Sequence, residues 1–160
     1  MERIYSGVVD RTGWPSGPWD GEPDKVQWTD AATGLPCVAV RHHMSGNWCG
    51  YVGVANDHPA YEKDCADIGV AVHGGGLTFA DRCQEGPEAE AICHVPEPGQ
   101  SDDVWWAGFD CHHAWDLAPG AVARWTKMGM FPALDAGEVY RDLAYVRAEC
   151  ASLAEQLAQS

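Results

Sequence analysis

The sequence predicts a single α+β domain, in which an antiparallel sheet is covered by a C-terminal amphipathic helix. Three observations lead to this fold class. The chain has 160 residues, of which 46% are hydrophobic and 21% are charged, and this composition suits one domain with a hydrophobic core. Short β-rich runs alternate with turn residues in its middle part. Near the C-terminal end, apolar residues recur at helical spacing.

Residues 1–36 are predicted to form an irregular Trp/Pro/Gly-rich N-terminal arm that is nevertheless ordered. Gly and Pro are dense here, as in "RTGWPSGPWDGEP", and they interrupt long helices and strands. Three tryptophans, Trp14, Trp19 and Trp28, provide large apolar surfaces that favour packing over disorder. We therefore expect the arm to lie across the domain.

Residues 37–134 are predicted to supply the sheet and its loops. The β-rich runs 37–43 and 48–55 flank the turn-like segment "MSGN", which indicates a hairpin. Further strands are expected at 68–73, 92–95 and 104–112. Three consecutive glycines, at 74–76, end the first of these strands and allow another group to approach the backbone closely.

Residues 135–158 are predicted to form the covering helix. Asp135 followed by Glu138 resembles a capping box, which satisfies backbone N–H groups at the start of a helix. The apolar stripe of this helix comprises Val139, Leu143, Val146, Cys150, Leu153 and Leu157. Because the spacings are three and four residues, these side chains share one side of the helix, and we expect that side to lie on the sheet.

The segment "DDVWWAGFDCHHAWD" (102–116) contains the predicted strand 104–112, whose side chains alternate between two faces. One face is uniformly apolar and suits a core under the helix; it carries Trp105, Ala107, Phe109 and Cys111. The other face ends in a carboxylate and an imidazole; it carries Val104, Trp106, Gly108, Asp110 and His112. This other face therefore predicts a lined cavity with an aromatic floor and a polar end.

The same alternation places a basic side chain near the end of several other predicted strands. These side chains, which oppose the bulkiest apolar residues of their strands, are Arg41, His43, His73 and His94. If the faces coincide in space, Trp106 is a stacking surface in a pocket that holds His73, His94, Asp110, His112 and Arg41. A single histidine on a strand is more often structural than functional, so this prediction depends on the clustering.

The charge balance excludes several classes of partner. Ten Lys and Arg residues stand against 24 Asp and Glu residues, and the net charge is −14. Such a chain lacks the basic face that nucleic acids and anionic membranes require. It does not exclude a small anionic ligand, because a few local cationic groups outweigh the global charge inside a pocket. Without a long apolar run or a signal-peptide pattern, a cytoplasmic protein is expected, and oligomer formation is left open.

The seven cysteines are expected to be reduced thiols that are mostly buried. Their number is odd, and they are spread from Cys37 to Cys150 without a Cys-x-x-Cys pair, so a zinc ribbon is not expected. No cofactor is predicted. A divalent metal held by His73, His94 and Asp110 is a less favoured variant.

Segments such as "GLPCVAVR", "WCGYVGV", "VHGGGLTFADRC", "ICHVPEPG" and "DDVWWAGFDCHHAWD" resemble a family of small proteins of tailed phages and prophages. The resemblance covers nearly the whole chain. It implies a phage origin and a setting in the cytosol of the host cell. Some small phage proteins with deep pockets inhibit host defence by acting on nucleotide messengers, and this analogy favours such a signal as the ligand. The family carries no catalytic residues over to this sequence.

Sequestration of a nucleotide-like, phosphate-bearing small molecule is the function that these patterns favour. Tryptophan stacks on bases, histidine and arginine hold phosphates, and consecutive glycine amides form an anion nest. The candidate ligand-binding residues are Arg41, His43, Trp48, Gly74, Gly75, Gly76, Arg82 and Trp106. His73 and His112 would also hold phosphates.

Two alternatives remain. A phosphodiesterase-like hydrolase would use histidine as acid and base, since histidine titrates near neutral pH. Its candidate catalytic residues are His73, His112, Asp110 and His94. A cysteine nucleophile is less favoured, because nothing in the sequence lowers a thiol pKa. The second alternative is an acidic protein–protein inhibitor of a host enzyme, although the acidic residues are dispersed rather than arranged in a stripe.

Overall fold

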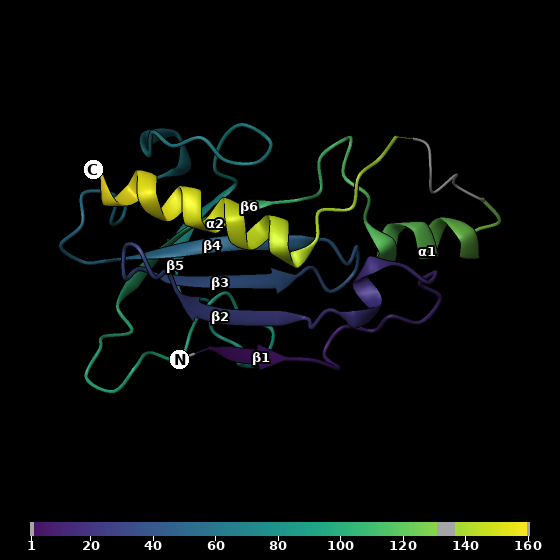
Figure 1. Ribbon diagram of the computed structural model, residues 1–160, viewed down its shortest axis with the longest axis horizontal. Coiled ribbons are helices and arrows are strands. Elements are labelled where there is room, and N and C mark those ends of the chain that lie inside the picture. Colours follow the sequence, from purple (N-terminus) through teal and green to yellow (C-terminus); the bar gives the residue numbers. More distant parts are fainter. Residues whose placement is uncertain (1, 131–136, 160) are drawn as a thin grey trace.

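The computed structural model describes residues 2–130 and 137–159 and shows an α+β domain in which a helix lies on a sheet (Figure 1). The described residues form six strands: β1 (Arg3–Tyr5), β2 (Lys25–Thr29), β3 (Pro36–Arg41), β4 (Trp48–Ala55), β5 (Phe79–Arg82) and β6 (Val104–Asp110). Their helices are α1 (Pro119–Lys127) and α2 (Leu143–Ala158), with short 3-10 helices at Pro18–Gly21 and Cys65–Asp67. The predicted fold class is confirmed.

All neighbouring strands of the sheet are antiparallel, in the order β1-β2-β3-β4-β6-β5. The predicted hairpin is present as β3 and β4, with Cys37 opposite Val52 and Arg41 opposite Trp48. β6 lies between β4 and β5, and its residues from Val104 onward are buried almost to its end. The tryptophan-rich strand therefore lies inside the sheet, with packed layers on both of its faces.

α2 covers one face of the sheet, which we call the helix face (Figure 1). The predicted apolar stripe is fully buried at Val146, Cys150, Leu153 and Leu157. It packs against the side chains that alternation assigns to the core, namely Trp105, Ala107, Phe109 and Cys111. The helix lies close to β4 because Gly50 has no side chain. A Cβ there would lie 2.6 Å from Cζ of Phe109 and 2.9 Å from Sγ of Cys150.

The opposite face of the sheet, which we call the second face, is partly covered by residues 83–101, the cover loop. A smaller core lies on this face, made of Val38, Val40, Tyr51, Val104 and Trp106. Two side chains of β2 anchor the loop: Lys25 donates to two of its carbonyl oxygens, and Gln27 bonds to the backbone N–H and C=O of Val95. Burial lowers the pKa of Lys25 to about 8.

The structure differs from the sequence-based expectations in its strands. The arm 1–36 contains β1 and β2 in addition to irregular segments. β2 was missed because it does not show the alternation of apolar and polar residues that marks a half-buried strand. Its polar residues Lys25 and Gln27 are buried, since both bond to the cover loop. Residues 68–73 and 92–95 do not form strands of the sheet. The prediction of strands there was wrong, since short apolar runs do not distinguish strands from packed loops.

α2 begins later than predicted. Its N-cap is Asp142, whose carboxylate accepts a hydrogen bond from the N–H of Tyr145 at 2.8 Å. Val139, expected to be the first residue of the stripe, lies before the helix and is 46% exposed. The expected cap residue Asp135 lies outside the described residues. α1 was not predicted, because it is short and begins with Pro119 and a glycine, which more often mark a loop.

Cys83 and Cys93 form a disulfide, so the expectation of seven reduced thiols was wrong for this pair. The two cysteines are 10 residues apart in the sequence. They meet because the cover loop turns back on itself, with the N–H of Gln84 donating to the carbonyl of Ile92. The remaining cysteines of the described chain are free: Cys37, Cys111 and Cys150 are buried, and Cys49 and Cys65 are half-buried.

Candidate functional site

Arg41 and Trp48 lie on the helix face and not beside Trp106 on the second face. The guanidinium of Arg41 is fully buried, donates to the carbonyl oxygen of Gly46 at 2.7 Å and pairs with Glu22 at 3.1 Å. It also lies over the ring of Trp48, 4.4 Å from the centroid. Both predicted ligand-binding side chains are thus engaged in contacts inside the domain.

Trp106 is also unavailable for stacking on a ligand. It lies on the second face, as alternation predicts, but its side chain is fully buried. Its ring meets that of His94 edge to face at 5.1 Å, and its Nε1–H donates to Sγ of Cys83 at 3.2 Å. The expected aromatic floor of a pocket is therefore part of the core beneath the cover loop.

His73 lies beside α2 in a closed network of hydrogen bonds. Its Nδ1 is 2.7 Å from the hydroxyl of Tyr145, and its Nε2 is 2.8 Å from Oδ2 of Asp116. Arg141 pairs with the other carboxylate oxygen of Asp116 at 3.0 Å. Burial acts to raise the pKa of Asp116, but the backbone N–H of His113, His73 and Arg141 outweigh it and lower the pKa. These bonds tie the loop after β6 to α2.

The triple glycine makes room for an imidazole of the protein itself. The φ angles of Gly74 and Gly75 are 83° and 113°, in the region that favours glycine. A Cβ on Gly74 would lie 2.3 Å from Nε2 of His113. The predicted anion nest of Gly74, Gly75 and Gly76 therefore lies against His113, and none of the three glycines lines the groove described below.

Arg82 and His94 lie apart from the other predicted site residues. Arg82 is exposed at the end of β5, where it pairs with Glu62 and donates to the hydroxyl of Tyr61. His94 belongs to the cover loop and packs on Trp106. The single pocket expected from strand alternation is thus not formed. Asp110 and His112 lie close together. His73 lies beside α2, His94 lies in the cover loop, and the side chain of Arg41 lies in a buried network on the helix face.

Two adjoining cavities form a groove at the second face, near the turn between β3 and β4. The larger cavity has a volume of about 550 Å³ and the smaller one about 320 Å³. They share three lining residues, His42, Cys49 and Tyr51. The larger cavity is also lined by Val8, Val9, Val40, His43 and Ile92, and the smaller one by Phe79, Asp110 and His112. Arg41 borders the larger cavity as well, although its side chain is fully buried.

Three imidazoles border the groove, and they come from two segments far apart in the sequence. His42 and His43 follow β3, with their rings stacked at 4.9 Å, and His112 follows β6. Nδ1 of His42 accepts hydrogen bonds from the N–H groups of Met44 and Ser45, so the neutral ring carries its proton on Nε2. Burial and the neighbouring imidazoles of His43 and His112 lower the pKa of His42. This ring is therefore a neutral donor near neutral pH.

Cys49 and Tyr51, which border both cavities, keep their protons near neutral pH. Burial raises the pKa of Cys49 to about 12 and moves the pKa of Tyr51 far above its usual range. Neither group is therefore an activated nucleophile. Tyr51 also meets Phe79 edge to face at 5.3 Å, and the two rings give the smaller cavity an aromatic wall.

The sequence pointed to only part of this groove. Arg41, His43, Asp110 and His112 were predicted as site residues, and they border it, although the side chain of Arg41 is bonded inside the domain. The three residues that line both cavities, His42, Cys49 and Tyr51, are among those that were not predicted. His42 could have been predicted from alternation. It lies two residues after Val40, so its side chain is expected on the same face of the sheet, the second face.

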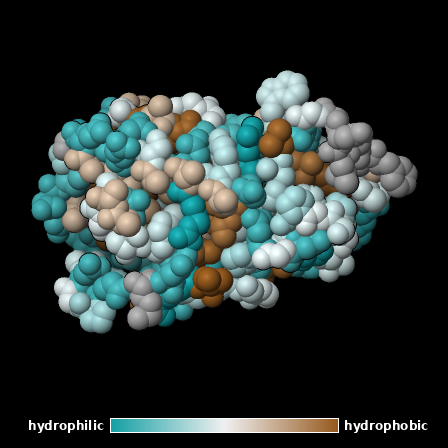
Figure 2. Space-filling model, in the orientation of Figure 1, coloured by the Kyte–Doolittle hydropathy of each residue, from teal (hydrophilic) through white to brown (hydrophobic). Residues whose placement is uncertain are grey.

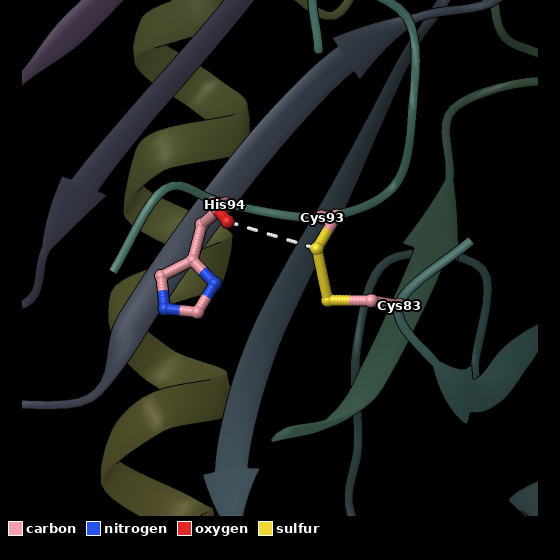
Figure 3. Close-up of side chains that lie close together, drawn as sticks. All are labelled: Cys83, Cys93 and His94. Carbon is pink, nitrogen blue, oxygen red and sulfur yellow. Dashed lines mark hydrogen bonds between the residues drawn. A yellow bond between two sulfur atoms is a disulfide. The ribbon is translucent and has the colours of Figure 1, made fainter. Parts of the chain in front are cut away.

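One group of cysteine, histidine and carboxylate side chains within residues 2–130 and 137–159 is compact enough for a metal ion. It consists of Cys83, Cys93 and His94, whose ligand atoms lie within 4.8 Å of one another (Figure 3). The set that the sequence suggested for a divalent metal, His73, His94 and Asp110, is not brought together. The compact group lies in the cover loop, outside the lining of the groove.

The face that carries α2 shows small hydrophobic areas scattered among hydrophilic side chains (Figure 2). Across the described ranges, no helix combines the length and apolar character needed to cross a membrane. Comparisons with protein-family models, with curated proteins and with solved structures found no match to this chain. The chemistry of the groove is therefore the basis for a functional proposal.

Proposed function

We propose that the groove binds a small phosphate-bearing, nucleotide-like molecule. The observation that carries this proposal is the meeting of three imidazoles, His42, His43 and His112, at two adjoining cavities. Sites for small molecules typically measure roughly 300–1,000 Å³ and combine apolar walls with a few polar groups. The larger cavity, at about 550 Å³, has this size. Imidazole N–H groups donate to phosphate oxygens.

The lining residues suggest how such a ligand would be divided between the cavities. The apolar wall of the larger cavity suits a base or another flat group, and it consists of Val8, Val9, Val40 and Ile92. His42 lies where the cavities meet, with His43 on one side and His112 on the other. Phosphates bound there would receive N–H donors from both segments of the chain.

Acidic side chains near the groove make the protonation of these imidazoles important. Glu90 borders the larger cavity and Asp110 borders the smaller one. Asp24 also borders the larger cavity, but Arg11 compensates its charge through a salt bridge of 2.6 Å. A phosphate in this groove binds most favourably when an imidazole is protonated, because the positive charge offsets the remaining carboxylates. Binding should therefore be coupled to proton uptake.

Sequestration is favoured over turnover by the groups that border the groove. Cys49 and Tyr51 keep their protons, and the carboxylate of Asp110 accepts from the backbone N–H of His112 at 3.1 Å. A hydrolytic base is normally oriented by a third group through its ring nitrogen. Such contacts exist between His73 and Asp116 at 2.8 Å and between His113 and Asp110 at 3.4 Å, but neither His73 nor His113 lines the groove. Hydrolysis of the same ligand is the alternative that the experiment below separates.

The setting that we propose is the cytosol of an infected host cell, which follows from the resemblance of the sequence to phage proteins. The ligand in that setting would be a nucleotide signal of host immunity. Cyclic dinucleotides and ADP-ribose-type nucleotides combine a base with phosphates, as the groove requires.

The test is incubation of the purified protein with a panel of cyclic dinucleotides and ADP-ribose-type nucleotides, followed by chromatography before and after heat denaturation. We expect one class to disappear from solution and to return intact on heating. A new product would support a hydrolase in place of a binding protein. A panel that stays unchanged would contradict the proposal and favour an acidic protein–protein inhibitor.

Variants locate the bound ligand. His42→Ala and His112→Ala should each weaken binding at least about tenfold, since each removes a charge-assisted hydrogen bond. His58→Gln is the matched control, because His58 contacts the carbonyl oxygen of Leu157 and does not line the groove. Loss of binding in His58→Gln alone would place the ligand elsewhere on the protein.

A further inference from the structure

We propose that Cys83, Cys93 and His94 form a binding site for a thiophilic divalent cation such as Zn²⁺ when the Cys83–Cys93 disulfide is reduced. All three residues belong to the cover loop: Cys83 is its first residue, directly after β5, and Cys93 and His94 follow each other further along it. Their two sulfur atoms and a ring nitrogen lie within 4.8 Å of one another, on adjacent stretches of chain (Figure 3). Ligand atoms from two segments thus converge at one place.

The donor set matches the chemistry of Zn²⁺ and Co²⁺. Two thiolates and an imidazole are preferred ligands of these cations, whereas Mg²⁺ and Ca²⁺ require oxygen. Three protein ligands leave the fourth position of a tetrahedral ion to water, as in zinc sites that remain open to a further ligand. This set was not predicted, because Cys83 and Cys93 are 10 residues apart and form no Cys-x-x-Cys pair.

His94 has the properties of a metal ligand. Its Nδ1 is buried and has no hydrogen-bond partner among the described residues. A buried polar atom of this kind normally has a partner, and a metal ion would supply one.

Trp106 supports the site from the sheet. Nε1–H of Trp106 donates to Sγ of Cys83 at 3.2 Å, and its ring packs edge-on against His94 at 5.1 Å. Outer donors of this kind orient the ligands of a metal and stabilise a thiolate.

Reduction of the disulfide requires a two-electron reductant, and a cellular dithiol would supply it. The S–S bond between Cys83 and Cys93 breaks, and the two sulfur atoms together take up two electrons and two protons. The dithiol becomes a disulfide in turn. Zn²⁺ then binds both sulfur atoms, and the two thiol protons leave to solvent. Oxidation by a disulfide compound reverses these steps and releases the cation.

Either link closes the part of the cover loop that borders the groove. Gln84, Ala89, Glu90 and Ile92 lie between the two cysteines in the sequence and line the larger cavity. The disulfide and the metal would therefore hold the same wall in oxidising and reducing surroundings. The metal proposal does not depend on the ligand of the groove, because its tests measure the cation.

Cobalt binding tests the proposal directly. The full chain is reduced with a phosphine, the phosphine is removed without air, and Co²⁺ is titrated in. We expect thiolate-to-cobalt charge-transfer absorption that saturates at one ion per chain and is abolished by Zn²⁺. The same protein with its disulfide intact should show no such band. A reduced protein without the band, or an oxidised one with it, would overturn the proposal.

Residue-specific experiments assign the ligands. Cys93→Ser and His94→Ala should each weaken Co²⁺ binding at least about tenfold, while Cys65→Ser, a free half-buried cysteine, should bind like the natural protein. Should a variant fail to fold, alkylation of the unmodified reduced chain gives the same information. Zn²⁺ should protect Cys83 and Cys93 from the alkylating reagent and leave Cys65 reactive. Protection of Cys65, or of neither member of the pair, would refute the assignment.

Discussion

Tyr51 on β4 lies directly opposite Gly108 on β6, and its ring occupies the space above the glycine. A Cβ on Gly108 would lie 2.2 Å from Cδ1 of Tyr51. Tyr51 borders both cavities of the groove. The absence of a side chain at Gly108 therefore sets the position of a ring that both cavities share. Gly108 is thus required by packing, since its φ lies outside the left-handed region.

Gly108→Ala should therefore lower the free energy of unfolding by about 1–3 kcal/mol, because the added methyl group forces the tyrosine ring to move. It should also weaken ligand binding in the groove. Urea unfolding measures the first effect. Gly69→Ala is the matched control, since a Cβ there meets nothing within 4 Å. Equal stability of the two variants would show that Tyr51 does not need the space at Gly108.

Arg41 is expected to stabilise the fold and to make no direct contact with a ligand. Arg41→Ala leaves the carboxylate of Glu22 without its buried partner, and breaking such a pair typically costs about 3–5 kcal/mol. Arg82→Ala is the comparison, because Arg82 is 56% exposed and its pairs with carboxylates are worth little. Guanidinium unfolding should show a large loss only for Arg41→Ala. Similar losses in both variants would contradict the buried network.

The stability of the protein should depend on pH through Lys25. Its pKa in the folded protein is about 8, below the value of 10.5 of the free side chain, because burial disfavours the charged form. The folded state therefore binds fewer protons than the unfolded state between these values, and the free energy of unfolding rises with pH in this window. The cost of burying the charge is fully present below pH 8 and is lost above pH 10.5.

Lys25→Met isolates this contribution. The difference in free energy of unfolding between the natural protein and the variant should change from about pH 8 to pH 10.5 and should be flat below that window. Urea unfolding at a series of pH values gives both curves. Two parallel curves would mean that Lys25 keeps an ordinary pKa in the folded protein.

Ligand binding should become stronger as the pH falls. The pKa of His42 lies below that of an ordinary imidazole, since burial and its neighbours His43 and His112 oppose its charge. Bringing a phosphate close favours the charged ring, so affinity should increase between about pH 8 and about pH 5, where imidazoles titrate. Calorimetry in buffers of different ionisation enthalpy measures the proton uptake. Affinity without pH dependence would exclude imidazoles as the phosphate-binding groups.

Alternation along the chain predicted the two faces of the sheet but not how the strands combine. It assigned Trp105 and Trp106 to opposite faces, and both assignments are confirmed. It did not show that Arg41 and Trp48 share the helix face with Trp105, because the relation between strands depends on their register. The pairing of β3 with β4 and of β4 with β6 sets that relation, and a single sequence does not contain it.

The groove and the group of Cys83, Cys93 and His94 could not be predicted from the sequence for a similar reason. Both depend on the cover loop, whose residues show no regular pattern. Lys25 and Gln27 hold this loop through backbone carbonyl and N–H groups, which every residue possesses. The meeting of Cys83 with Cys93 also follows from the path of the loop. The stripe of α2, in contrast, was readable because it depends only on helical spacing.

NMR of the histidine ring nitrogens, during titration with each nucleotide of the panel, tests whether imidazoles of the groove bind a phosphate-bearing molecule. We expect the ligand to shift the ring resonances of His42, His43 and His112 and to move them toward the protonated form, while those of His58 stay unchanged. Shifts confined to His58, His73 or His94, or no shift with any nucleotide, would contradict the proposal.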